Sequence, residues 1–144
     1  MIAALLMLAQ IAPVQAAPKP IATTVAAIRS NPKRFDGQVV RIHGWVHACQ
    51  RLSCAIFERA SQTPEEAGKW LSIAADPKFD AIVKPLLPTY VEFDARVDAT
   101  CIDPRVTTDD KGNQVITVCA DRAPDLTIVS LRSVVSPEPP EIEN

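Results

Sequence analysis

Apolar and polar residues alternate along positions 39–49, and this period of two predicts a β-strand that buries one face. The face that we expect to point into the core carries Val40, Ile42, Val46 and Ala48. The opposite face carries Arg41, His43, Trp45, His47 and Cys49. Gly44 interrupts the pattern in mid-strand, which predicts a bulge or a tight bend at that position.

Five later segments also have the pattern of strands, namely residues 54–58, 70–74, 90–101, 115–120 and 126–135. Alternation is clearest in the third of them, whose predicted core face carries Val91, Phe93, Ala95, Val97, Ala99 and Cys101. Its other face carries Glu92 and Asp94, which we interpret as ordinary solvent-exposed residues. Polar turn-forming residues at 61–68 and 109–113 predict turns between strands.

Two segments predict short helices. Residues 23–30 place Val25 and Ile28 on one face, with Thr23 or Thr24 as the N-cap and Asn31-Pro32 as the stop. The second helix is predicted to begin at Asp76-Pro77, because aspartate is a favourable N-cap and proline suits the first helical position. Helical spacing then continues through Phe79, Ile82, Val83 and Leu86 or Leu87, and Pro85 and Pro88 limit its length.

Composition indicates one ordinary globular domain. The chain has 144 residues, of which 47% are hydrophobic and 22% are charged, enough for a single core. Its net charge of −2 argues against a nucleic-acid partner held by overall charge.

The first 16 residues predict export. They contain no charged side chain, and an apolar stretch at 2–9 precedes the small-x-small cleavage pattern Val14-Gln15-Ala16. The stretch is too short to span a membrane, which takes about 20 apolar residues. Because no Lys or Arg precedes it, an N-terminal buried helix is the alternative. We expect a signal peptide at 1–16, a flexible leader at 17–22, a domain at 23–135 and a disordered Pro- and Glu-rich tail at 136–144. The mature protein is then periplasmic or secreted, without a transmembrane segment.

Four cysteines agree with an oxidising compartment, where an even number favours disulfides. Cys49 and Cys54 bracket a turn-length insert, and Cys101 and Cys119 lie at similar distances from the predicted turn at 109–113. Opposed residues of a hairpin lie within disulfide range, so we predict the pairs Cys49–Cys54 and Cys101–Cys119. Free buried thiols and a zinc site are the alternatives, but the spacing lacks paired Cys-x2-Cys knuckles.

The run Phe35-Asp36-Gly37-Gln38-Val39-Val40-Arg41-Ile42-His43-Gly44-Trp45-Val46 resembles the opening strand of many OB-folds, including the anticodon-binding domain of some aminoacyl-tRNA synthetases. The resemblance implies a mainly β fold: a small, five-stranded, Greek-key OB-fold-like barrel. It has a leading short helix and one helix between strands 3 and 4. With a signal peptide, the nearer likeness is to exported bacterial OB-fold proteins of the envelope, which are mostly binding modules.

The candidate binding residues are Arg41, His43, Trp45, His47, Phe57 and Trp70. Cationic and aromatic side chains on one strand face can stack a base or a sugar, or dock a partner. The alternatives are that Trp45 packs beneath the leading helix or the last strand, and that Phe57 or Trp70 belongs to the core. His43 and His47 are separated by about 13 Å of strand, too far to share one metal ion without a severe local bend, which a bulge at Gly44 could supply.

No catalytic motif is present: the sequence lacks Gly-x-Ser-x-Gly, His-Glu-x-x-His and a phosphate-binding loop. The acidic residues near 109–113 lack the spacing of a calcium loop and predict a polar hairpin tip. We therefore expect no enzyme, cofactor or metal. The sequence favours a non-catalytic adaptor whose partner is an envelope protein or a small polar ligand. The alternative is a module for oligosaccharide or single-stranded nucleic acid.

Overall fold

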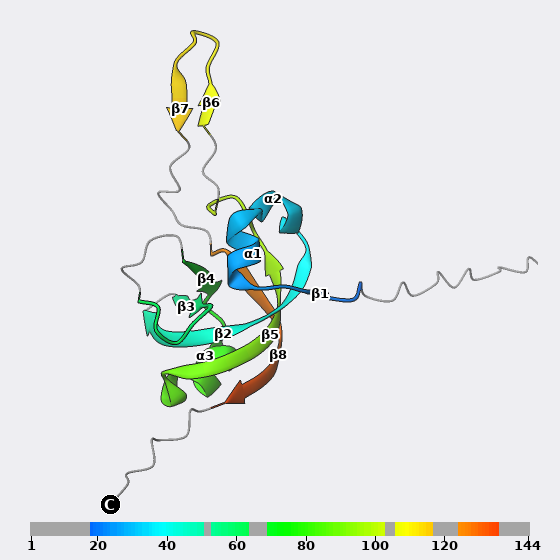
Figure 1. Cartoon of the computed structure of the whole chain (residues 1–144), viewed down its shortest axis with the longest axis vertical. Coiled ribbons are helices and arrows are strands. Elements are labelled where there is room, and N and C mark those ends of the chain that lie inside the picture. The colour runs from blue at the N-terminus through cyan, green and yellow to red at the C-terminus, as the bar shows by residue number, and fades with distance from the viewer. Residues whose placement is uncertain (1–17, 51–52, 64–68, 103–105, 117–123, 136–144) are drawn as a thin grey trace, which may run out of the picture.

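The computed structural model describes residues 18–50, 53–63, 69–102, 106–116 and 124–135, and in these ranges the chain is mainly β-structure (Figure 1). The strands are β1 (Ile21–Ala22), β2 (Val39–Gln50), β3 (Ser53–Phe57), β4 (Trp70–Ala74), β5 (Thr89–Val97), β6 (Val106–Thr108), β7 (Gln114–Ile116) and β8 (Leu126–Val135). The helices are α1 (Val25–Ser30), α2 (Pro32–Phe35) and α3 (Pro77–Val83), and the 3-10 turn η1 (Lys84–Leu86) follows α3 directly.

Six strands form one sheet in the order β1-β2-β3-β4-β8-β5, and β2 also pairs with β5. This additional pairing closes β2, β3, β4, β8 and β5 into a ring, with β1 attached to β2 (Figure 1). The ring pairings are antiparallel except for β4 with β8, which are parallel and share only the register pair Ile73 and Leu126. The predicted β class is confirmed.

The long strand β2 has two partners because it changes neighbours halfway. Its residues from Val39 to Val46 pair with β5, whereas β3 pairs with it from Trp45 onward. Gly44 lies at this crossing, and a Cβ there would be 2.4 Å from the carbonyl oxygen of Phe57. The glycine therefore marks a close backbone approach at the bend of the strand.

The predicted core face of β2 is wrong at its end. Ala48 is exposed, while Cys49, predicted on the outer face, packs against the core. The register between β2 and β3 shifts between Val46 and Cys49. An extra residue in one strand reverses the faces beyond it, which explains the exchange.

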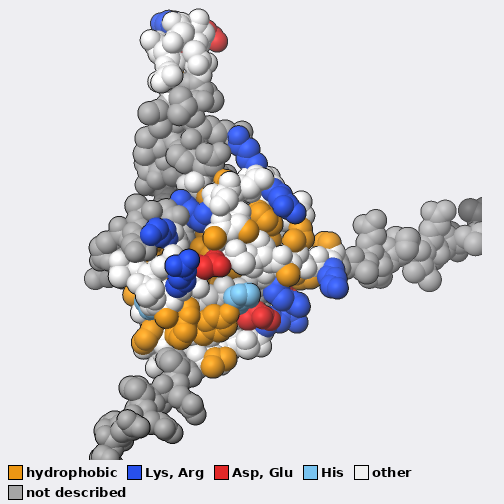
Figure 2. All heavy atoms as spheres, in the orientation of Figure 1, with side chains coloured by type: hydrophobic (Ala, Val, Ile, Leu, Met, Phe, Trp, Pro, Cys, Tyr) orange, Lys and Arg blue, Asp and Glu red, His pale blue; other side chains and the backbone are white. Residues whose placement is uncertain are grey.

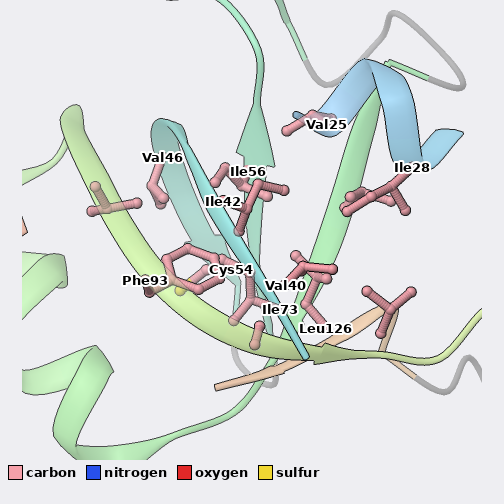
Figure 3. Close-up of a cluster of buried hydrophobic side chains, with 14 of the residues drawn as sticks. Val25, Ile28, Val40, Ile42, Val46, Cys54, Ile56, Ile73, Phe93 and Leu126 are labelled. Atoms are coloured by element: carbon pink, nitrogen blue, oxygen red, sulfur yellow. The ribbon is translucent and has the colours of Figure 1, made fainter. Parts of the chain in front are cut away.

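The core fills the ring and the spaces beneath the helices (Figure 3). Val40, Ile42 and Val46 from β2 meet Ile56, Ile73, Phe93 and Leu126 from the other ring strands. Helix α1 adds Val25 and Ile28, and Thr24 caps it by accepting a hydrogen bond from the backbone N–H of Ala27. Helix α3 adds Phe79 and Val83, and its predicted cap Asp76 accepts hydrogen bonds from two backbone N–H groups. Both predicted helices are confirmed.

Several local predictions differ from the structure. The fifth strand of the ring is β8, whereas the described part of predicted strand 115–120 belongs to the separate hairpin of β6 and β7 (Figure 1). Ile21 and Ala22, expected in a loose leader, form β1 and pair in parallel with β2. The chain also forms the short helix α2 after Asn31, where we predicted only a stop. The predicted signal peptide and C-terminal tail lie outside the described residues.

Candidate binding face

Five side chains form one row across the outer face of the ring. Their cross-strand order is Trp70 on β4, Phe57 on β3, Trp45 on β2, Tyr90 on β5 and Val135 on β8. Directly opposed residues share a face, and five neighbouring strands extend about 19 Å. We call this set the aromatic row. The sequence-predicted residues Trp45, Phe57 and Trp70 are therefore brought together.

Ring contacts connect the aromatic row to the two histidines of β2. The Trp45 ring lies 5.6 Å from the Tyr90 ring, edge to face, and stacks on His47 at 6.3 Å with an interplanar angle of 11°. His47 also lies 5.2 Å from Phe57, and His43 lies 5.9 Å from Tyr90. These centroid distances are those of attractive aromatic contacts. Both predicted histidines thus flank the aromatic row.

The aromatic row is sheltered in the middle and open at one end. Phe57 is buried, Trp45, Trp70 and Tyr90 are half-buried, and Val135 is 55% exposed. Figure 2 shows hydrophobic side chains next to a histidine and to basic and acidic side chains on the face it displays. Burial raises the pKa of Tyr90, and the nearby charge of Glu92 raises it further. Its hydroxyl therefore stays protonated and polar beside the apolar rings.

A charged cluster lies two rows away on the same face. The register places Arg41 on β2, Asp94 on β5 and Ser130 on β8 side by side. Arg41 donates to both carboxylate oxygens of Asp94, at 2.9 and 3.3 Å. Arg132 donates to the same carboxylate through Nε at 2.9 Å and through Nη2, and Ser130 Oγ lies 3.3 Å from it. Asp94, interpreted from the sequence as solvent-exposed, is thus a covered residue, because long side chains from both neighbouring strands close over it.

The two arginines hold Asp94 ionised. Hydrogen bonds from Arg41 and Arg132 and their positive charges outweigh the effect of burial and lower the pKa of Asp94 from 3.8 to about 2. The hydrogen bond to Asp94 raises the pKa of Arg41 in return. Asp94 and Arg41 therefore keep their charges through the physiological pH range.

Two irregularities of β8 orient its side chains on this face. The pairing of β8 with β5 shifts between Glu92 and Phe93 and again between Asp94 and Ala95, which leaves Arg132 and Val129 as extra residues. Bulges re-aim side chains. The first shift lets Arg132 reach Asp94 while Ser133 still stands opposite Glu92.

Disulfide bonding agrees with the sequence prediction where it is described. Cys49 and Cys54 are bonded and close the end of the β2–β3 hairpin. Cys101 is disulfide-bonded as well, and Cys119, its predicted partner, lies outside the described residues. No cysteine of the described chain is free, which contradicts the alternatives of free thiols and of a zinc site at these residues.

Sequence reasoning identified six residues of this face and missed three others. Arg41, His43, Trp45, His47 and Trp70 lie on it or border it, whereas Phe57 shares the row but is 1% exposed, which confirms the alternative of a core position for it. Tyr90, Asp94 and Arg132 were not predicted as site residues. Tyr90 and Asp94 share an alternating strand face, a signal that could have drawn attention to them, but their partners depend on a pairing register that local patterns do not reveal.

The described residues include no group of three or more His, Cys, Asp or Glu side chains placed to hold a metal ion. Among them, no helix is both long and apolar enough to cross a membrane. Comparison with models of known protein families finds no match, and comparison with curated proteins finds none either.

Proposed function

We propose that the protein is an exported, disulfide-stabilised binding module with an OB fold, and that it serves as a non-catalytic interaction protein of the cell envelope. The OB assignment is supported by the five-stranded ring β2-β3-β4-β8-β5. It is also supported by helix α3, which lies in the sequence between β4 and β5, the third and fourth ring strands along the chain. Export is supported by the signal-like residues 1–16 and by the cystines, which persist in oxidising compartments.

The aromatic row carries the proposal of a protein partner. Tryptophan, tyrosine and arginine are the residues most enriched at the energetic centres of protein interfaces. Here Trp45 and Tyr90 are in edge-to-face contact, and Arg41 lies on the same strand face as Trp45, about 13 Å away. Val135, at the open end of the aromatic row, is an exposed apolar side chain that a partner could bury. An apolar strip bordered by fixed charges suits a protein surface that is wide and partly polar.

A second candidate is an oligosaccharide or a single strand of nucleic acid. The observation that favours it is the stacked pair Trp45 and His47, because aromatic faces stack sugars and bases. The affinity of a protein for nucleic acid falls steeply as the salt concentration rises. The mixed charge of Arg41, Asp94, Arg132 and Glu92 on this face makes the protein partner the leading proposal.

The test is site-specific photo-crosslinking in cells that express the full chain. A benzophenone amino acid replaces Val135 on the aromatic row or, as the control, Ile82, an exposed apolar residue of α3. We expect a discrete protein adduct from position 135 that survives nuclease and is absent from position 82. Trp45→Ala should reduce the adduct several-fold while the purified protein keeps its circular dichroism spectrum.

Other outcomes separate the candidates. An adduct that disappears on nuclease treatment supports the nucleic-acid alternative and contradicts the adaptor. Equal adducts from positions 135 and 82 mean that the aromatic row is not the contact surface. An absence of protein adducts at 135, with binding of glycan fragments that changes the fluorescence of Trp45, supports the oligosaccharide alternative instead.

A further inference from the structure

Two arginines bind the buried carboxylate of Asp94 on the outer face, and a third lies on the same face. Arg41 comes from β2, Arg132 from β8, and Arg96 follows Asp94 by two residues on β5, so that it shares the face. Arg96 is held by a hydrogen bond from its Nη1 to the carbonyl oxygen of Gly37 at 2.8 Å. We call Arg41, Arg96 and Arg132 the arginine cluster. Arg41 and Arg132 share the carboxylate of Asp94, and Arg96 adds a third positive charge on this face.

One carboxylate does not use all the donors that the arginine cluster presents. Both oxygens of Asp94 already accept hydrogen bonds, and its side chain is 2% exposed. Arg41 and Arg132 remain 38% and 46% exposed, and each uses Nε and Nη2 for Asp94. Within the described part of the chain, Nη1 of neither arginine has a hydrogen-bond partner. Two oriented guanidinium groups therefore present unused N–H donors to solvent.

The arginine cluster is a local excess of positive charge on a chain whose net charge is −2. A guanidinium recognises an oxyanion best when its orientation is already fixed, because less side-chain entropy is then lost on binding. Asp94 supplies that fixed orientation for Arg41 and Arg132.

We propose that Arg41 and Arg132 bind a carboxylate of the partner protein, which contributes an extended acidic segment to this face. This inference rests on the proposed function and specifies the chemistry of the partner. The acidic side chain contacts the arginine cluster while an apolar side chain of the same segment contacts the aromatic row. Four residues of strand separate Arg41 from Trp45, about 13 Å, which an extended peptide spans with four residues.

Glu92 determines where acidic residues can lie along the bound segment. It lies between the two sites, opposite His43 and Ser133, and it borders a hollow of about 340 Å³ together with Thr23, Arg41 and His43. A second carboxylate of the segment, placed over the row of His43, Glu92 and Ser133, would be repelled by Glu92. The middle of the segment is therefore neutral and polar, and its acidic residues are confined to the end at the arginine cluster.

The experiment uses two synthetic peptides, WSTSDD and its neutral match WSTSNN, each acetylated and amidated. They are titrated into nitrogen-15-labelled protein purified after expression of the full chain, and the side-chain Nε–H signals of Arg41 and Arg132 are followed by NMR. We expect WSTSDD to shift both signals saturably and to bind about tenfold more tightly than WSTSNN, with a difference that shrinks in high salt. Arg132→Gln should remove this preference, whereas the control Arg59→Gln, at an exposed arginine outside the face, should keep it.

Each other result overturns the inference. Equal binding of the two peptides, no shift of either arginine signal at millimolar peptide, or equal effects of Arg132→Gln and Arg59→Gln would show that the arginine cluster only stabilises the fold. Displacement of WSTSDD by trigalacturonate at lower concentration would show that the anion belongs to an acidic glycan. If Arg132→Gln leaves the cellular adduct at position 135 unchanged while Trp45→Ala reduces it, the proposed function stands and this inference alone fails.

Discussion

At the scale of single residues, two arginines stabilise the charge of the buried Asp94. Its carboxylate accepts hydrogen bonds from Arg41 and Arg132, which approach from strands on either side. These bonds lower its pKa from 3.8 to about 2. A carboxyl whose pKa is lower in the folded state stabilises that state above its unfolded pKa and loses the effect as pH falls through the folded value.

Asp94→Asn should therefore lower stability in a pH-dependent way. Lowering the pKa from 3.8 to about 2 corresponds to about 2 kcal/mol of stabilisation. We expect the variant to be less stable than the wild-type protein by about 2 kcal/mol at pH 7, a difference that begins to shrink below about pH 5 and is lost only near pH 1, as the pH falls through the folded pKa. Urea unfolding followed by circular dichroism at several pH values measures it. Asp110→Asn, at the exposed tip of the β6–β7 hairpin, is the control and should change stability by less than about 0.5 kcal/mol at every pH.

Residue-level prediction from the sequence succeeded where the signal was alternation along one strand. The outer position of Arg41, His43, Trp45 and His47 follows from the apolar residues between them. The burial of Asp94 does not follow from any local pattern. It results from the pairing of β5 with both β2 and β8 and from two arginine side chains long enough to cover it.

At the scale of elements, β2 organises the ring because it pairs with β5 along its first part and with β3 along its second. The bend between the two parts brings the backbone of Phe57 against Gly44. A side chain at this position would meet both the carbonyl oxygen of Phe57 and, at 2.9 Å, the side chain of Ile56. Glycine therefore permits the bend that sets Trp45 between Tyr90 and Phe57.

Gly44→Ala should destabilise the protein by about 1–3 kcal/mol, since an added methyl group in a packed site forces backbone shifts. The comparison is Gly37→Ala, where a Cβ would meet nothing within 4 Å but φ is +71°. We expect that variant to cost about 1 kcal/mol through its backbone conformation alone. Urea unfolding gives both values, and the fluorescence of Trp45 should report a disturbed aromatic row only in Gly44→Ala. A neutral effect of Gly44→Ala would show that the bend has room to adjust.

Elements were predictable where their signals are local, and their pairing was not. The capped starts of α1 and α3 and the alternation of β2 and β5 lie within short segments, so their positions were predicted within a few residues. The assignment of residues 115–120 to the ring failed, because Gln114–Ile116 has a strand pattern whichever strand it joins. The short strand β1 carries too few residues to form a period, and only its contact with β2 defines it.

At the scale of the whole molecule, the ring is closed at one narrow seam. Strands β4 and β8 share a single register pair, whereas β5 pairs with β2 and β8 along most of its length. Two reciprocal hydrogen bonds strengthen this seam: Ser72 N–H donates to Asp125 Oδ2 at 2.7 Å, and Asp125 N–H donates to Ser72 Oγ at 2.9 Å. Both residues are buried, so water does not replace these bonds while the ring is closed.

Asp125→Ala should open the seam before the rest of the fold is lost. It leaves the buried N–H of Ser72 without its acceptor, which costs about 1–3 kcal/mol. Hydrogen exchange should lose protection first in β4 and at the start of β8, while β2 and β5 stay protected. Asp125→Asn keeps a side-chain oxygen for Ser72 and should have a smaller effect. Uniform loss of protection in Asp125→Ala would mean that the ring unfolds as one cooperative unit. The aromatic row begins at Trp70 on β4, which is one side of the seam. Opening the seam should therefore also loosen Trp70, so that the stability of the ring and the order of the proposed binding face depend on each other.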